Sequence, residues 1–247
     1  MISIIGLEGI PLIRSGDELG GIIAEAAERQ GVSIEDGDVV VVTQKIVSKA
    51  EGQLVDLKEI EPSEFAREIA DGSGREPEHV EVILRETGRI VTMKRGVLII
   101  ETKHGFVCAN AGVDRSNVEE GLVCLLPEDP DESARRIRDR IREMTGRETA
   151  VIITDTWGRP WRLGQVDFAI GLAGMSPFRD YRGETDTFGY TLNVTNIAVA
   201  DELASAAELA KGKLSDIPVV IIRGYDYPEG EGCAKDLFRP VEEDLFR

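Results

Sequence analysis

Two short polar segments in this 247-residue sequence follow apolar runs and combine groups that metal-assisted chemistry requires. The first is "NAGVDRSNVEEG", residues 110–121, in which Asp114 and Asn117 crowd a glycine-containing turn after a strand that we expect to end at Ala109. A carboxylate at a strand end is held stiffly by the sheet and suits a metal ion, while Asn117 could hydrogen-bond a base or a ribose. The alternative is a plain turn in which Asp114 caps the next segment.

The second segment is "TDTWGRPWR", residues 154–162. Asp155 follows a buried apolar strand, and Thr156 adds a hydroxyl oxygen, so the pair offers the oxygen ligands that Mg²⁺ prefers. Arg159 and Arg162 could hold a carboxylate or a phosphate through paired N–H donors.

The same segment contains both tryptophans of the chain, Trp157 and Trp161. Their flat faces suit an extended aromatic ligand, although a packed turn whose tryptophans fill the edge of a core remains the alternative. If they do bind a ligand, it is anionic and partly aromatic, because arginines and metal-type oxygens lie beside them in the sequence.

Lysines in two further segments could meet an anion. Lys45 and Lys49 follow the apolar run "DVVVVT", and Lys211 and Lys213 close the segment of small residues "ADELASAAELAKGK", residues 200–213. Each segment has a simpler interpretation, since lysines after a strand are often solvated and a helix rich in alanine is often only tightly packed.

Composition narrows the class of protein. Lys and Arg number 29 against 46 Asp and Glu, for a net charge of −17, which argues against a nucleic-acid or membrane-surface role. An anionic ligand would need local cations or metal ions, and many carboxylates with two histidines suit Mg²⁺ or Mn²⁺ better than zinc. The opening residues lack the features of a signal peptide and no run reaches about 20 apolar residues, so we expect a cytoplasmic enzyme or binding protein.

Several common motifs are absent from the sequence: GxxxxGK[ST], GxGxxG after a strand, GxSxG and HExxH. His79 and His104 are not spaced as a metal pair. Cys108, Cys124 and Cys233 are odd in number and lack CxxC spacing, so we expect reduced core thiols.

Hydrophobic periodicity and turn residues predict the elements that position these groups. Helices are expected over residues 17–31 (with Asp17 as N-cap and Gly31 as stop), 61–74, 76–88, 131–146 and 196–213. Strands are expected over residues 2–13, from 37 until the chain becomes polar at Thr43 and Gln44, and over 89–94, 96–103, 105–112, 149–156 and 217–224. Hairpin turns are predicted at Arg95–Gly96 and His104–Gly105.

This mixed order favours an α/β or α+β fold that is neither Rossmann nor P-loop. No clear linker divides residues 1–247, so we expect a single catalytic unit, with two intertwined lobes as an open alternative. Residues 176–190 form the longest irregular stretch and are either a lid, a substrate loop or a connection.

Five blocks of the sequence together resemble the coenzyme F-420-0:γ-glutamyl ligase family. They are "GIPLI", "VTQKIVSKAEG", "HGFVCANAGVDRSN", "TDTWGRPWRLGQVDFAIG" and "VADELASAAELAKGK". The resemblance implies an unusual mixed-sheet α/β fold, a homodimer and an amide-forming ligase of coenzyme F-420 biosynthesis. Such an enzyme uses GTP and divalent metal to add one L-glutamate, and then a second through a γ-linkage, to the deazaflavin coenzyme F-420-0 by way of an acyl phosphate.

The resemblance also implies roles for particular residues. Asp114 and Asp155 would hold one Mg²⁺ or Mn²⁺, and Thr156 with Glu208 a second, with Glu202 as an open alternative to Glu208. Arg159 and Arg162 join Asp114 and Asp155 as expected catalytic residues, and whether K⁺ is required stays open. The residues expected to contact GTP are Pro11, Leu12, Ile13, Arg14, Thr43, Gln44, Lys45, Lys49, Asn117, Ala206, Ala207, Glu208, Leu209, Ala210, Lys211, Gly212 and Lys213.

Two rival functions remain at this stage. A metal-dependent nucleotide hydrolase would turn over GTP without an acceptor, and a non-catalytic deazaflavin-binding protein would bind the coenzyme without regard to metal or GTP. The pair Asp114 and Asp155 argues against the passive binder, because buried carboxylates do not help to bind an anion. We further hypothesise that the deazaflavin stacks on a tryptophan of the Trp157–Arg162 turn.

Overall fold

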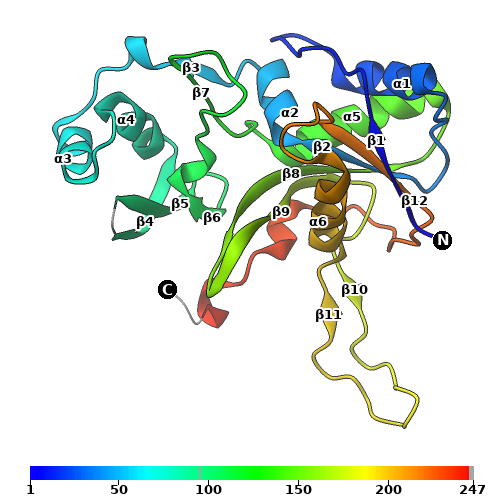
Figure 1. The fold of residues 1–247 in the computed structure, drawn as a ribbon. Helices are drawn as coiled ribbons and strands as arrows, with labels where there is room; N and C mark the ends of the chain where they lie inside the picture. The colour runs from blue at the N-terminus through cyan, green and yellow to red at the C-terminus, as the bar shows by residue number, and fades with distance from the viewer. Residues whose placement is uncertain (95, 245–247) are drawn as a thin grey trace.

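The computed structural model describes residues 1–94 and 96–244, and its centre is a five-stranded mixed sheet (Figure 1). The strands in spatial order are β1 (Ser3–Leu7), β12 (Val219–Arg223), β2 (Val39–Thr43), β8 (Ala150–Arg159) and β9 (Arg162–Ala173). β2 and β8 run parallel, whereas the other neighbouring pairs are antiparallel. The prediction of a mixed α/β fold is confirmed.

Three long helices cover this sheet. α1 (Leu19–Gln30) and α5 (Pro130–Thr145) pack together on one face, and α6 (Val199–Lys211) lies on the other (Figure 1). The expected N-cap of the first helix is wrong by one residue: the Glu18 carboxylate accepts the N–H groups of Gly20 and Gly21, while Asp17 accepts the N–H of Arg14.

The structure adds two elements that the sequence pattern conceals. The chain leaves β2 directly into a short helix, α2 (Gln44–Ala50), where a polar strand end was expected. β8 continues through the expected turn to Arg159 and pairs with β9, which was not predicted as a strand. The outer half of β9 is exposed and polar, so its alternation gives no strand signal.

A smaller lobe has its own cluster of buried hydrophobic side chains. It contains α3 (Glu64–Ser73), α4 (Pro77–Arg85) and the antiparallel strands β4 (Thr87–Lys94), β5 (Val97–Thr102) and β6 (Val107–Ala109). The turn predicted at His104–Gly105 joins β5 to β6; the other predicted turn includes Arg95, which lies outside the described residues. β6 contacts β8, which places the smaller lobe against the long hairpin.

Short elements complete the chain. They are β3 (Leu54–Asp56) paired with β7 (Leu122–Cys124), β10 (Arg179–Asp180) paired with β11 (Asn196–Ile197), and the 3₁₀ turns η1 (Leu57–Glu59), η2 (Asn110–Gly112), η3 (Ala234–Leu237) and η4 (Val241–Glu243). Cys108 and Cys124 are buried free thiols, as expected, and Cys233 is free but half-buried. Within the described residues, no helix is both long and apolar enough to cross a membrane.

The irregular stretch 176–190 belongs to a longer arm that β10 and β11 start and that projects from the body (Figure 1). An isolated bridge between Thr185 and Thr191 stiffens its outer part. Phe188 and Val194 on the arm are 95% and 88% exposed. The arm therefore presents apolar side chains far from the two cores.

Candidate functional site

The β8–β9 hairpin presents different chemistry on its two faces. Asp155 pairs with Phe168 in the register, and Thr156 pairs with Asp167. Since side chains alternate along a strand, Asp155 and Trp157 point to one face, whereas Thr156 and Asp167 point to the face that α6 covers. The expected site residues Asp155 and Thr156 are therefore neighbours in sequence that address opposite sides of the sheet.

On the Asp155 face, the structure brings Asp114 and Lys45 together. A backbone bridge to Cys124 fixes Asp114, and the Lys45 Nζ lies 2.5 Å from the Asp114 Oδ2. Ser116 also donates to this carboxylate, from its backbone N–H at 2.8 Å and its Oγ at 2.6 Å. Burial raises the pKa of Asp114, but the hydrogen bonds from Lys45 and Ser116 outweigh it and hold that pKa below the ordinary value.

Among residues 1–94 and 96–244, no such cationic group contacts Asp155 directly. Its Oδ1 accepts the backbone N–H of Thr156 at 2.8 Å. Burial raises the pKa of Asp155 to about 6, and the negative charges of Asp114 and Asp167 add to the rise, while Lys45 and the hydrogen bond oppose it. A cation placed between Asp114 and Asp155 would relieve this unfavourable charge.

On the opposite face, Asp167 is the centre of a buried network that the sequence analysis missed. The Asp167 side chain is 2% exposed, and its Oδ2 lies 2.5 Å from the Lys211 Nζ and 3.0 Å from the Thr154 hydroxyl. The Thr156 hydroxyl donates to the Asp167 Oδ1 at 2.5 Å. Burial raises the pKa of Asp167, but Lys211 and the hydrogen bonds outweigh it, so the pKa is lowered. The one available signal was an aspartate inside the apolar run "VDFAIG".

Lys213 extends this network to the surface. Its Nζ lies 2.6 Å from the Thr156 Oγ1, 3.1 Å from the Glu208 Oε1 and 3.8 Å from the Asp167 Oδ1. The expected partners Thr156 and Glu208 are thus brought together through an ammonium group. Glu202, the alternative to Glu208, is exposed on the same helix, and within the part of the chain that the structure describes no hydrogen bond or ion pair joins it to this network.

The donor set is of the kind that suits a hard divalent cation. Carboxylate and hydroxyl oxygens lie on both faces of the hairpin, and these are the ligand types that Mg²⁺ and Mn²⁺ prefer. No group of three or more His, Cys, Asp or Glu side chains has metal-binding geometry among the described residues. Lysine ammonium groups contact these oxygens instead: Lys45 contacts Asp114 on one face, and Lys213 contacts Thr156 and Glu208 on the other.

Other expected residues lie farther from these two clusters or point elsewhere. Arg159 and Arg162 lie at the outer end of the hairpin, where Arg159 donates to the Leu163 carbonyl at 3.2 Å. Trp161, in the hairpin turn, is 80% exposed and has a left-handed φ of 59°. The Trp157 ring stacks on Phe168, with a centroid distance of 5.1 Å. One face of Trp157 is therefore already covered by protein.

Some of the residues expected to contact GTP lie near the Asp114 and Asp167 clusters, and others lie apart from them. Thr43 and Gln44 form the β2–α2 junction that positions Lys45. The charge of Lys49 acts to lower the pKa of Cys124, the residue that bridges to Asp114.

Asn117 is exposed in the turn after Asp114, with a left-handed φ of 54°. In the N-terminal loop, Leu12 is exposed and Ile13 belongs to the main core, flanked by Pro11 and Arg14. The expected residues 206–213, which include Ala206, Ala210 and Gly212, span the end of α6 and the residues after it. Their side chains point in different directions, since Ala207 is buried and Leu209 is 86% exposed.

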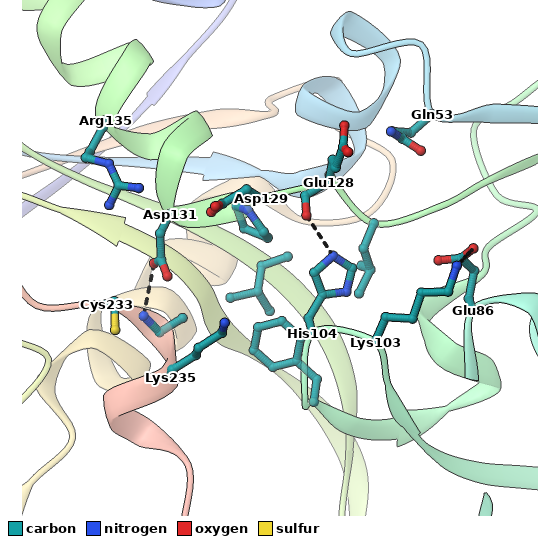
Figure 2. Close-up of a pocket in the computed structure, with 15 residues that line it drawn as sticks. Gln53, Glu86, Lys103, His104, Glu128, Asp129, Asp131, Arg135, Cys233 and Lys235 are labelled. Carbon is teal, nitrogen blue, oxygen red and sulfur yellow. Dashed lines mark hydrogen bonds and ion pairs between the residues drawn. The ribbon is translucent and has the colours of Figure 1, made fainter. Parts of the chain in front are cut away.

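A separate cavity of about 660 Å³ lies between α5, η3 and the β5–β6 turn (Figure 2). Lys103, His104, Arg135 and Lys235 contribute cationic or titratable groups to it, alongside several carboxylates. None of the residues expected to bind metal or GTP lines this cavity. It is therefore distinct from the clusters around Asp114 and Asp167.

Comparison with known proteins agrees with the resemblance of the sequence. A family model described as F420-0:Gamma-glutamyl ligase matches residues 9–224. The chain is 49% identical to a coenzyme F420:L-glutamate ligase of Methanothermobacter thermautotrophicus, over 100% of this chain and 99% of the relative. Proteins of the same name from Methanocaldococcus jannaschii and Methanopyrus kandleri are 46% and 47% identical, over 100% and 98% of this chain and 97% of each relative. Since the similarity covers nearly the whole chain, this protein belongs to the F420-0:Gamma-glutamyl ligase family.

Proposed function

We propose that this protein is a coenzyme F420:L-glutamate ligase that uses GTP and divalent metal to add L-glutamate to coenzyme F-420-0. The observation that carries the proposal is the full-length similarity to relatives of that name, at 40–49% identity. The two clusters of oxygen donors and lysines on the β8–β9 hairpin and α6 support it, because a ligase of this kind must bring anionic substrates together.

The chemistry explains why such clusters are useful. A carboxylate is a poor electrophile, so the acceptor carboxylate would first take the γ-phosphoryl group of GTP and release GDP. The amine of L-glutamate would then attack the acyl phosphate, lose a proton and displace inorganic phosphate to form the amide. Catalysis of phosphoryl transfer is mainly positioning and charge stabilisation, which fixed carboxylates and lysines can supply.

The metal proposal assigns residues to two ions. Asp114 and Asp155 would hold one Mg²⁺ or Mn²⁺, and Thr156 and Glu208, beside Asp167, a second. Bound divalent ions would neutralise the phosphates and stabilise the charge that develops on them. Lys45 and Lys213 lie at the same oxygens and would offer their ammonium groups to the phosphates, whereas Lys211 stays buried as the counter-charge of Asp167.

A homodimer is part of the proposal, and the projecting arm supports it. Phe188 and Val194 are almost fully exposed, and large exposed apolar side chains on a projection favour contact with another surface. The Phe188→Ser, Val194→Ser double variant should elute as a smaller species than the wild type when its mass is measured by light scattering. An unchanged mass would show that the arm does not carry the association.

For the proposed stacking of the deazaflavin we favour Trp161, whose side chain is 80% exposed in the hairpin turn, whereas the Trp157 ring stacks on Phe168. Trp161→Leu should raise the acceptor KM and leave the KM for GTP unchanged. If the acceptor KM is unchanged in both Trp157→Leu and Trp161→Leu, the stacking proposal is wrong.

The function is tested by phosphate release from GTP with Mg²⁺ or Mn²⁺, with and without F-420-0 and L-glutamate, followed by the mass of the coenzyme product. The ligase predicts release that requires both acceptors and a product heavier by one or two glutamyl units. Asp155→Asn should abolish both, whereas Asp71→Asn, an exposed aspartate on α3, serves as the matched control. Release without acceptors and without a mass change would indicate a nucleotide hydrolase, and coenzyme binding without turnover a carrier protein.

A further inference from the structure

Lys213 and Lys211 contact the same carboxylate but differ in their freedom to leave it. The Lys211 side chain is 2% exposed, and its Nζ is fixed by both Asp167 and Thr154. The Lys213 side chain is 59% exposed and follows Gly212, which ends α6 with a left-handed φ of 58°. Lys211 is therefore a permanent partner of Asp167, whereas Lys213 can move away without unfolding the helix.

The ammonium of Lys213 faces three oxygen atoms, which we call the three-oxygen cage: the Thr156 Oγ1, the Asp167 Oδ1 and the Glu208 Oε1. The Thr156 hydroxyl donates its hydrogen to Asp167, so its lone pairs point toward Lys213. The cage thus presents two anionic groups and an oriented hydroxyl oxygen to a cation.

Charge balance shows what a change of cation would do. With both lysines in place, the charges of Asp167 and Glu208 are formally balanced. Replacing the single charge of Lys213 by a divalent ion leaves the cluster with one net positive charge and also frees the ammonium. Both changes favour an anionic phosphate at this position.

We infer that Lys213 is an exchangeable counter-cation that occupies the three-oxygen cage until a divalent metal replaces it, and that Lys211 and Asp167 hold the cage in shape during the exchange. This inference rests on the metal part of the proposed function. It adds that metal binding competes directly with Lys213, so the lysine weakens metal binding in the absence of nucleotide.

The test is the affinity for Mn²⁺ without nucleotide, followed by the EPR signal of the free ion at constant pH. Lys213→Met should bind Mn²⁺ about three- to tenfold more tightly than wild type, because the competing charge is gone. Lys213→Arg, which keeps a cation, should resemble wild type. Lys58→Met, an exposed lysine on η1, is the control for the loss of one surface charge.

Equal or weaker Mn²⁺ binding by Lys213→Met overturns the exchange. A gain of the same size in Lys58→Met also overturns it, since the effect would then be one of net charge alone. If neither wild type nor Lys213→Met binds Mn²⁺ even with GTP present, the exchange and the metal dependence fail together. Glutamyl addition, measured by product mass, would still decide the ligase separately.

Discussion

The two faces of the β8–β9 hairpin each carry an aspartate, and the two side chains have different surroundings and opposite pKa shifts. Asp167 is buried with Lys211 at 2.5 Å, and its pKa is lowered. Asp155 pairs with Phe168, the neighbour of Asp167, and points to the other face. It accepts a backbone hydrogen bond, none of the lysines that the structure describes contacts it, and its pKa is raised to about 6. The fold itself therefore supplies the counter-charge of Asp167, whereas Asp155 is left for a proton or an external cation to neutralise.

The largest expected effect on stability comes from breaking the buried ion pair between Lys211 and Asp167. Lys211→Met removes the buried ammonium group from Asp167 and leaves the carboxylate to the exposed Lys213, 3.8 Å away, which costs roughly 3–5 kcal/mol of unfolding free energy. Urea denaturation would measure it. The Lys211→Met, Asp167→Leu double variant should recover much of the loss. If it is as unstable as the single variant, packing of the lysine chain rather than its charge explains the effect.

The next effect concerns the aromatic packing beside Asp155. Trp157 stacks on Phe168 and lies 5.9 Å, centroid to centroid, from Phe106, a main-core residue in the β5–β6 turn. Trp157→Leu should lower the unfolding free energy by about 2–3 kcal/mol, because buried aromatic area is lost. Trp161→Leu, at the exposed turn, should stay within about 0.5 kcal/mol of wild type in the same denaturation experiment. Equal effects would contradict the packing role given to Trp157.

The third effect is a pH dependence of stability that arises from Asp155. The folded pKa of about 6 lies above the model-compound value of 3.8, so the folded state holds its proton more tightly and the metal-free protein loses stability as pH rises from about 4 through 6. Asp155→Asn should therefore be more stable than wild type above pH 6, by on the order of 2 kcal/mol. Thermal unfolding in EDTA measures the gain, which should vanish near pH 4. A gain that does not depend on pH would refute the assignment to titration of Asp155.

The smallest effect is expected from an exposed ion pair, which serves as the reference for Lys211. Lys103 and Glu86 are 3.1 Å apart, with side chains 58% and 22% exposed. Lys103→Met should change the unfolding free energy by about 0–1 kcal/mol, since solvent and salt screen such a pair. The small change should shrink further in high salt, unlike the loss in Lys211→Met. Comparable losses in the two variants would show that burial does not set the strength of these pairs.

The amino-acid pattern alone predicted the mixed fold class and most helices, and it pointed to the residue types of a candidate site. Helical spacing and flanking proline and glycine located α3, α4 and α5, and the apolar runs located β2, β8 and β12. Residue types alone indicated oxygen donors and lysines for an anionic ligand, because these properties depend on local composition and periodicity.

Which of those groups come into contact depends on the three-dimensional fold. Alternation along β8 sends Asp155 and Thr156 to opposite faces, and the pairing with β9 brings in Asp167 from a strand with no clear signal. Lys211 reaches that carboxylate from 44 residues away, and Lys45 reaches Asp114 across 69. Such contacts depend on strand register and on helix docking against the sheet, which short-range sequence patterns do not encode.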